Sequence, residues 1–495
     1  AIAGVSLSES GSTTGETFTA TLTDTNGLLS ATGTGVSGSG TTSLTISGSV
    51  AVVNAALATL KDTEAATGAD TITLGATDGF GNAAATKTIA VTTTSNIHWT
   101  SQISGNFPVG NDWTPHVAPG ATDAAILDAP GSTAYIVIAS TSETVASVQT
   151  ASTARLAITG GVFTVTNGTG AGSNAGQVSV TQNGTLDIGG VFANSKVFYV
   201  ENNGVVKVAA GGLTLTGSGT LYLADNTLEG ATSGATLTTS NFIYGAGQLG
   251  AGQMTLVNQA AGVIESYGSS LFIIDTGANT ITNAGAFLAL GAGGMTIASA
   301  VANSGHFAVN GGSMTVTGAV TGSGYAEVVR GTLDFGGTFN ENVIFTSGST
   351  GTLELGDSLA YTTGRIQGLS TTGTNALDLG DITFIAGTTK ATFSGSKTSG
   401  VLTVTDGTHT ARIGLIGNYA GHTFTTSLGA GGVGTRIVDP PAAGFSTTSP
   451  LAPPPHAFIA AMAAFGPQAS GQIHPVSHAG QGHVSMIAMP RFAQA

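Results

Sequence analysis

The sequence predicts an all-β protein in which an N-terminal Ig-like β-sandwich is followed by a parallel β-helix, a β-solenoid, with an irregular C-terminal tail. Three observations lead to this prediction. Blocks of the form Gly-x-apolar-x-apolar recur between residues 136 and 395, several of them about twenty residues apart. Glycine and asparagine stand between these blocks, as expected where the backbone turns. Residues 1–94 instead show short alternating strands separated by turn signals, as in a sandwich.

The sandwich module is predicted over residues 1–94. "GETFTATLTDTNG" alternates and ends in an Asn-Gly turn signal, and "DTITLGATDGFGN" and "TIAVT" supply later strands. Between them, "SVAVVNAALATL" places its apolar residues on one face of a short helix: Val52, Val53, Ala56, Leu57 and Leu60. These stretches resemble the Ig-like or cadherin-like modules of large bacterial surface adhesins.

Residues 95–135 contain both tryptophans and several prolines. The first coil of a solenoid exposes apolar core, which a cap must cover. We therefore predict that this segment is a connector and a solenoid cap.

The repeat that predicts the β-helix, over residues 136–395, is clearest after residue 282. "NAGAF" at 283–287 returns as "NSGHF" at 303–307, and "MTI" at 295–297 returns as "MTV" at 314–316. A period near twenty predicts coils whose inward apolar side chains stack on one another. An array of ordinary sandwich modules is the alternative, but it predicts a period of about a hundred residues, which the sequence does not show.

Residues 396–438 are predicted to form a closing β-hairpin module around Asp406 and Gly407. With its flanking segments it resembles a closing module of very long, repetitive α-proteobacterial surface proteins. The tail, residues 439–495, is rich in Pro, Ala and His and is predicted to be linker-like at first, with a secretion or assembly role. The resemblance implies a C-terminal signal for type I secretion.

Charge and composition disfavour several kinds of partner. Acidic residues outnumber basic ones by 26 to 12, and the net charge is −14. Nucleic acids and anionic membrane surfaces require clustered Lys and Arg, so we expect neither as a partner. The chain has no cysteine and no stretch near the ~20 apolar residues of a membrane span, so we expect no disulfide and no integral membrane protein.

Two short loops are the candidate metal sites. Asp24 and Asn26 lie in "DTNG", and Asp78 and Asn82 lie in "DGFGN". Such loops supply the oxygen ligands that Ca²⁺ prefers, whereas the alternative is that these residues simply form turns. Ca²⁺ is the one cofactor that the sequence suggests.

Three acidic residues recur at one place in the coil. Asp334 in "GTLDF" and Glu354 in "GTLEL" lie twenty residues apart, and Asp378 extends the column. A solvated outer face is the favoured interpretation. A bound cation or a catalytic carboxylate pair are the alternatives.

Four tyrosines also follow one another at about one coil. Tyr199, Tyr222, Tyr244 and Tyr267 are separated by 23, 22 and 23 residues. The favoured interpretation is an aromatic ladder that stabilises the coil, and a glycan-binding stripe is the alternative.

Together these features favour a secreted, non-enzymatic structural protein of a bacterial cell surface or extracellular matrix. It would be adhesin-like, S-layer-like or filament-forming, and would self-associate through its β-rich rod. Ile2, Val5 and Leu7 in "AIAGVSLSES" form a candidate donor strand for pairing with another copy. The alternative is a β-helix that binds or degrades polysaccharide. Degradation would require basic residues and carboxylates in one groove, and the whole chain has only 12 basic residues.

Overall fold

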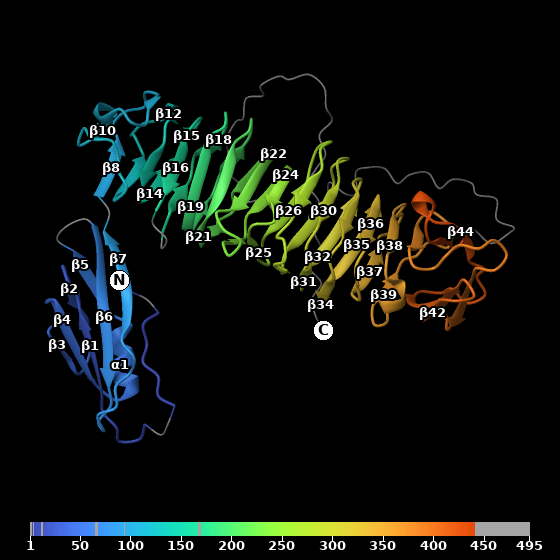
Figure 1. Cartoon of the computed structure of the whole chain (residues 1–495), viewed down its shortest axis with the longest axis horizontal. Helices are drawn as coiled ribbons and strands as arrows, with labels where there is room; N and C mark the ends of the chain where they lie inside the picture. The colour runs from blue at the N-terminus through green and yellow to red at the C-terminus, as the bar shows by residue number, and fades with distance from the viewer. Residues whose placement is uncertain are drawn as a thin grey trace. The chain divides into compact units, whose positions relative to one another are not determined.

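The computed structural model describes residues 2, 4–10, 13–64, 68–93, 95–166 and 170–440 (Figure 1). The structure is all-β, with 4% helix and 51% strand, and contains a parallel β-solenoid of about 12 turns over residues 124–379. The predicted all-β class and the predicted solenoid are therefore confirmed. The predicted tail beyond Pro440 lies outside the described residues.

The N-terminal module is antiparallel. A five-stranded sheet has the order β3-β4-β1-β6-β7, and β2 pairs with β5. The helix predicted here begins after Ser49, whose side chain accepts a hydrogen bond from the backbone N–H of Val52. The elements are β1 (Phe18–Thr23), β2 (Gly27–Ser30), β3 (Val36–Ser37), β4 (Ser43–Gly48), α1 (Val50–Leu57), β5 (Lys61–Glu64), β6 (Gly68–Thr77) and β7 (Lys87–Thr93). Its Ig-like character stays a prediction.

One apolar core holds this module together. Strands β1, β4 and β6 alternate, so that one face of the sheet carries Phe18, Leu22, Ile46 and Ile72. The helix contributes Leu57 from the face that the sequence predicted to be apolar. Burying each of these side chains stabilises the fold by about 1.5–3 kcal/mol.

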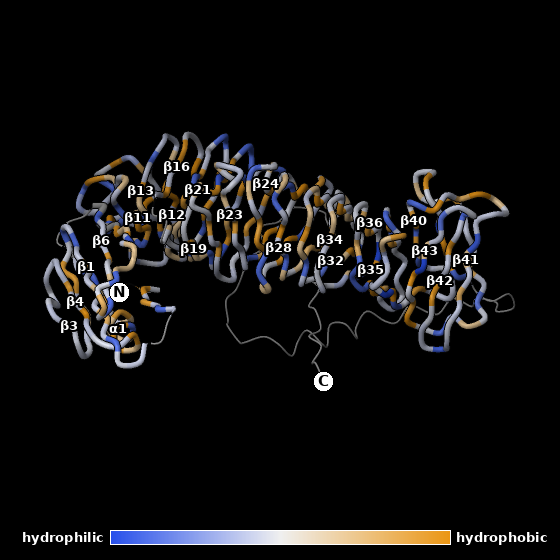
Figure 2. Tube along the Cα trace, turned by 60° about the horizontal axis from the view of Figure 1, so that its bottom comes forward, coloured by the Kyte–Doolittle hydropathy of each residue, from blue (hydrophilic) through white to orange (hydrophobic). Residues whose placement is uncertain are grey.

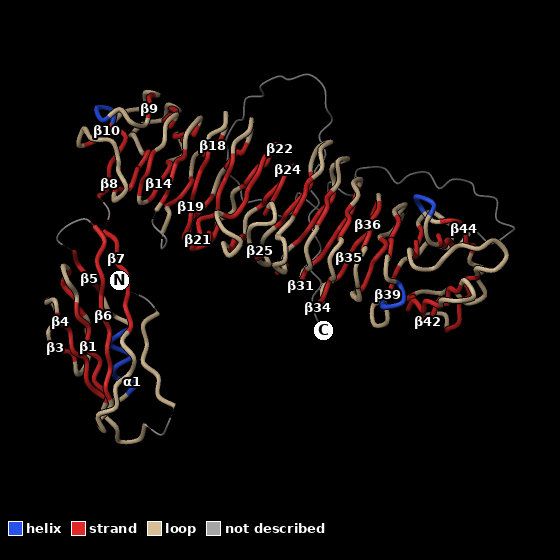
Figure 3. The backbone as a smooth tube through the Cα atoms, in the orientation of Figure 1, coloured by secondary structure: helices blue, strands red, loops and turns tan. Residues whose placement is uncertain are grey.

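Three stacks of parallel strands, named A, B and C here, build the solenoid (Figures 1 and 3). Stack A consists of β8 (Ser95–Trp99), β11 (Asp123–Leu127), β14 (Ser147–Thr150), β17 (Gly172–Asn174), the ends of β19 (Thr185–Asn194) and β21 (Val205–Thr216), β23 (Thr236–Thr239), β25 (Thr255–Asn258), β28 (Ile281–Asn283), β31 (Val301–Asn303) and β34 (Val320–Gly322).

Stack B consists of β9 (Gly105–Asn106), β12 (Tyr135–Ala139), β15 (Ala154–Ile158), β18 (Gln177–Val180), β20 (Val197–Val200), the starts of β22 (Thr220–Gly230) and β24 (Phe242–Gly250), β26 (Val263–Ser266), β29 (Ala286–Ala289), β32 (His306–Asn310), β35 (Tyr325–Arg330), β37 (Asn342–Phe345), β39 (Arg365–Gln367) and β43 (Thr410–Ile416).

Stack C consists of β13 (Glu143–Val145), β16 (Val162–Val165), the starts of β19 and β21, the ends of β22 and β24, β27 (Phe272–Ile274), β30 (Met295–Ile297), β33 (Met314–Val316), β36 (Thr332–Phe335), β38 (Thr352–Leu355) and β40 (Ala376–Leu379). Strand β45 (Thr435–Val438) adds to its end in the antiparallel sense. The four long strands, β19, β21, β22 and β24, therefore belong to two stacks each.

The sequence repeat is one coil of the solenoid. Asn283 pairs in register with Asn303 in stack A, and Phe287 pairs with Phe307 in stack B. The two phenylalanine rings stack inside the core with centroids 5.8 Å apart. Apolar residues continue in this way along the rod (Figure 2), and they form one buried cluster from Ile97 to Ile437.

Aromatic residues fill the first end of the rod. Strand β8 pairs in parallel with β11, and the short strand β10 (Trp113–Thr114) pairs with β8 in the antiparallel sense. Trp99 and Trp113 meet edge to face with ring centroids 4.9 Å apart, and the Trp113 indole donates to the carbonyl of Phe107. The tryptophans of the predicted cap thus lie on the first coil.

Antiparallel strands follow the last parallel coils. Strand β45 pairs antiparallel with β40, and β42 (Ser399–Thr405) forms a hairpin with β43 around Asp406 and Gly407, as predicted. The edge strands here are β41 (Lys390–Gly395) and β44 (Thr425–Leu428). The parallel turns thus extend over residues 124–379 and not 136–395, because the alanine-rich β11 lacks the Gly-x-apolar pattern and β41 has an antiparallel partner.

Candidate functional site

The four tyrosines form a column on the outer face of stack B. Tyr199 pairs in register with Tyr222, and Tyr222 pairs with Tyr244. The next residue of the column is Glu265, and Tyr267 follows two residues later on the same coil. Successive ring centroids lie 6.1, 4.8 and 6.1 Å apart. The predicted tyrosine stacking is therefore present, and these four residues are called the tyrosine column below.

Strand alternation points these rings away from the core. In β20, Phe198 and Val200 are buried while Tyr199 between them is partly exposed. Tyr267 is the most accessible of the four, with 48% of its surface exposed. Burial raises the pKa of the Tyr222 and Tyr244 hydroxyls, so both stay protonated and can donate hydrogen bonds at neutral pH.

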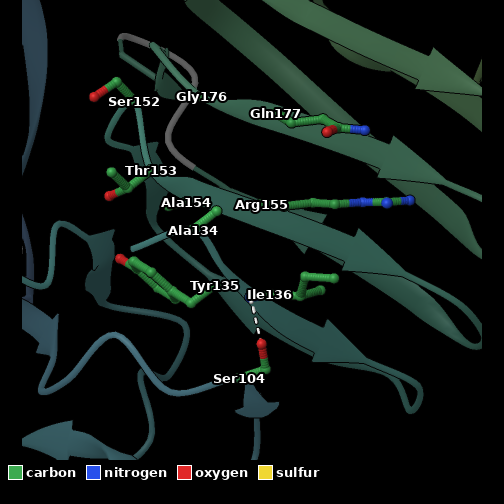
Figure 4. A pocket seen from close by; sticks show the side chains of 10 residues that line it. All are labelled: Ser104, Ala134, Tyr135, Ile136, Ser152, Thr153, Ala154, Arg155, Gly176 and Gln177. Atoms are coloured by element: carbon green, nitrogen blue, oxygen red, sulfur yellow. Dashed lines mark hydrogen bonds between the residues drawn. The ribbon is translucent and has the colours of Figure 1, made fainter. Parts of the chain in front are cut away.

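A surface pocket of about 430 Å³ lies at the start of β12, β15 and β18 (Figure 4). Ile136, Arg155 and Gln177 come from these three successive strands, and their side chains extend toward the same side in the picture. The Oγ of Ser104 accepts a hydrogen bond from the backbone N–H of Ile136. The lining residues are Ser104, Ala134, Tyr135, Ile136, Ser152, Thr153, Ala154, Arg155, Gly176 and Gln177.

Arg155 connects this pocket to the tyrosine column. Its Nε donates a hydrogen bond of 3.1 Å to the Oγ of Ser179. Ser179 pairs in register with Tyr199, so it is the residue that precedes the first tyrosine of the column. The pocket, the guanidinium group and the tyrosines are therefore neighbours on the outer face of one sheet.

The acidic residues predicted to share a place in the coil form a column on stack C. Asp334 pairs with Glu354, and Glu354 pairs with Asp378. Burial raises the pKa of all three carboxyl groups, and the charges of Asp334 and Asp378 raise the pKa of Glu354 further. These three residues are called the acidic column.

The last member of the acidic column departs from the predicted solvated face. Asp378 is only 1% exposed because β45 packs beside it, and its Oδ2 accepts from the backbone N–H of Ala430 at 2.9 Å. Arg436 stands opposite Asp378 in the antiparallel pair, and its Nη1 donates to Thr352. The closing strand thus contributes a positive charge to the end of an acidic row.

A third column lies inside the rod and was missed from the sequence. In stack A, the side-chain amide of Asn258 donates to Asn283 at 2.8 Å, and Asn283 donates to Asn303 at 2.7 Å. Asn303 then donates to Oε2 of Glu341 at 2.6 Å, and the backbone N–H of Gly324 donates to its Oε1. All four side chains are buried. The three asparagines are called the asparagine column.

Glu341 ends this column, and its two carboxyl oxygens accept from Asn303 and Gly324. It is 4% exposed, and burial raises its pKa to about 7, although the hydrogen bonds from Asn303 and Gly324 oppose that shift. From the sequence, asparagine was predicted at turns, where the backbone has positive φ. Asn202 and Asn203 do have positive φ, whereas Asn283 and Asn303 do not and serve as buried hydrogen-bonding residues.

The two predicted calcium loops do not meet. Asp24 follows the end of β1, and Asp78 follows the end of β6, which runs antiparallel to β1. Asp24 and Asn26 therefore lie near one end of the sheet and Asp78 and Asn82 near the other. Within its own loop, Asp78 accepts hydrogen bonds from the N–H groups of Phe80 and Asn82.

Asp24 is instead surrounded by other carboxylates. Its Oδ1 accepts from the N–H groups of Asn26 and Gly27, and Asp70 and Asp62 lie close enough to add to the effect of burial in raising the pKa of Asp24. Among the described residues, no group of three or more His, Asp or Glu side chains has the arrangement of a metal site. Calcium binding stays a prediction.

The candidate donor strand packs on its own module. The side chains of Ile2, Val5 and Leu7 are partly buried against the N-terminal core. The N–H of Ile2 donates to the carbonyl of Leu60, and Asn54 makes two hydrogen bonds to the backbone of Leu7. Exchange of this strand between copies, which stays a prediction, would have to break these contacts.

No protein-family model, curated protein or solved structure matches the chain. In the described part of the chain, no helix has the length and apolar character needed to cross a membrane.

Proposed function

We propose that this chain is a secreted, non-enzymatic structural protein of a bacterial cell surface or extracellular matrix, and that it self-associates through an exposed edge strand. The solenoid acts as a stiff spacer in this proposal. The resemblance of the N-terminal module and of the closing hairpin to large repetitive adhesins supports the location and the secretion route. The observation that carries self-association is the position of β7 at the edge of its sheet, where its one partner among the described residues is β6.

Strand β7 has the properties of an edge that pairs with another copy. It lies at the border of the five-stranded sheet, and within the described residues it pairs only with β6. It is seven residues long and its single charge, Lys87, stands at its start. Natural edge strands usually carry charges, prolines or bulges that block such pairing. The uncharged run that follows Lys87 lacks these protections.

A lysine placed in the middle of this edge tests the proposal. Ala90 is exposed on the outer face of β7, so Ala90→Lys should leave the module folded and prevent strand pairing between copies. Thr21 is exposed on the central strand β1, so Thr21→Lys adds the same charge away from the edge.

Negative-stain electron microscopy and sedimentation over a range of concentrations provide the measurement. We expect filaments, sheets or multimers for the wild type and for Thr21→Lys, and single rods for Ala90→Lys. Wild-type protein that stays monomeric at every concentration would contradict the proposal, as would multimers of Ala90→Lys. Repeating the wild-type measurement with a calcium chelator shows whether cations contribute to the contacts.

A further inference from the structure

The outer face of stack B combines two neighbouring features, a pocket and an aromatic row. The tyrosine column spans four coils, from β20 to β26, and the strand spacing makes this span roughly 14 Å. Directly before it come Ser179, Arg155 and the pocket at the start of β12, β15 and β18 (Figure 4). The pocket therefore lies two register positions to one side of the aromatic row, and Arg155 reaches that row through its hydrogen bond to Ser179.

The spacing of the row suits a regular polymer. The rings recur once per coil: Tyr199, Tyr222 and Tyr244 occupy the same register position, and Tyr267 continues the row from two residues beyond that position on the next coil. Phe242 lies beside Tyr244 with ring planes 9° apart and widens the apolar surface at this coil. A linear chain of ring-shaped units can place successive units on successive tyrosines when its rise per unit is close to the strand spacing.

The chemistry of the row suits sugars. The C–H face of a pyranose packs on an aromatic ring, while its hydroxyl groups need donors and acceptors at the edges. The tyrosine hydroxyls, the amide of Gln177 and the guanidinium of Arg155 supply both on this face. A ladder that only filled space against a neighbouring element would leave no reason for the polar pocket at its end.

The charge of the protein favours some of the ligands that can stack on aromatic rings over others. Nucleic acid bases also stack on tyrosine, but their phosphates require a basic groove. Here Arg155 is the one basic residue among those that line the pocket, and the whole chain carries a net charge of −14. The negative charge of the chain repels the phosphates of a nucleic acid, whereas a neutral polymer is not repelled.

We propose that stack B carries a binding track for a neutral, linear polysaccharide, formed by Arg155, Gln177 and the tyrosine column. The polymer lies along the rod axis, stacks its sugar rings on the tyrosines and places one end at the pocket. This track is independent of the β7 edge, so the protein attaches to a polysaccharide through stack B and to its own copies through the N-terminal module.

Binding is measured with the full chain by affinity electrophoresis and by sedimentation with a panel of neutral polysaccharides: mixed-linkage β-glucan, xylan, glucomannan and β-galactan. Alginate, a polyanion, is the comparison. We expect at least one neutral polymer to bind more tightly than alginate. Tyr222→Ala should weaken that binding about tenfold, which corresponds to the ~1.4 kcal/mol that an aromatic contact can provide.

Two further variants make the result decisive. Tyr267→Ala removes the most exposed ring and tolerates truncation best, so it should weaken binding even if Tyr222→Ala lowers the stability of the rod. Tyr325→Ala is the matched control, because Tyr325 lies on the same stack beyond the column and stacks on His306. It should bind as the wild type does.

Several outcomes would overturn the track. They are failure to bind any of the four neutral polymers, binding of alginate alone, or equal loss in Tyr325→Ala and Tyr222→Ala. Failure here is separate from failure of self-association: Ala90→Lys should bind polysaccharide normally, and Tyr222→Ala should assemble normally.

Discussion

The asparagine column inside the rod and the acidic column on its surface have the same geometry. In both, equivalent residues of successive coils lie in register on parallel strands, about 4.8 Å apart. Their electrostatics are opposite. Asn283 donates to Asn303 and accepts from Asn258, whereas each carboxylate can only accept, so the charges of its neighbours raise the pKa of Glu354.

The difference shows what a solenoid requires of a repeated polar residue. Because equivalent residues lie in register, the interaction between a side chain and its copy on the next coil is repeated from coil to coil. An amide can donate to one copy and accept from another, so it can be buried. A side chain that repels its copy has to stay partly in water or meet a counter-charge, as Asp378 does beside Arg436. Replacing amide by acid, or acid by amide, tests this account directly.

The largest effect is expected when an acid replaces the middle amide. Asn283→Asp leaves a buried charge that cannot donate to Asn303, so we expect the free energy of unfolding at pH 8 to fall by about 3–5 kcal/mol. Asn342→Asp is the control, because that exposed side chain only accepts, from the backbone N–H of Arg365. Chemical denaturation of both variants measures the difference, and equal losses would contradict the account.

A smaller effect concerns the acid that ends the asparagine column. The folded-state pKa of Glu341 is about 7, above its ordinary value of 4.5. Its stabilising contribution is therefore complete below pH 4.5 and is lost as the pH rises through 7. Glu341→Gln should remove about 1–3 kcal/mol of the decrease in stability between pH 5 and pH 8. Glu265, whose pKa burial also raises to about 7, contributes in the same direction.

Unfolding curves of wild type, Glu341→Gln and Glu265→Gln at several pH values separate the two contributions. Each variant should flatten the pH dependence in part, and the double variant should flatten it most. A wild-type stability that rises between pH 5 and pH 8 would show that the buried carboxyl groups do not control it.

The smallest effect is expected in the acidic column. Glu354→Gln removes the charge between Asp334 and Asp378 and should raise the free energy of unfolding at pH 8 by roughly 0.2–1 kcal/mol. The gain should shrink at 1 M salt, since salt screens the repulsion on the partly exposed face. A variant less stable than wild type in low salt would show that Glu354 makes a favourable contact with Arg436.

The period of the sequence was enough to predict the solenoid and both outer columns. Tyr199, Tyr222 and Tyr244 recur at one coil each, and the equal spacing of Asp334 and Glu354 led directly to their pairing. Such predictions succeed because a parallel coil converts a constant spacing along the chain into contact in space.

What the sequence did not predict depends on burial and on unequal spacing. Asn283 and Asn303 were interpreted as turn residues because asparagine is common in turns, and nothing in the pattern separates an inward amide from an outward one. Glu341 joins them from 38 residues beyond Asn303, across a coil that has no asparagine at that position. In the N-terminal module, antiparallel register places Asp24 beside Asp70 and away from Asp78.

The strands at the two ends of the rod have a consequence for its evolution. A bare coil offers a template on which parallel strands can continue to add, but β10 at one end and β42 and β45 at the other run against that direction. These antiparallel strands cover the first strand of stack A and the last strands of stacks B and C, so parallel strands cannot be added there and the number of coils in the sequence sets the length of the rod. Each duplicated coil of about twenty residues lengthens it by roughly 4.8 Å. Natural selection can thus change the length of the solenoid in steps of one coil.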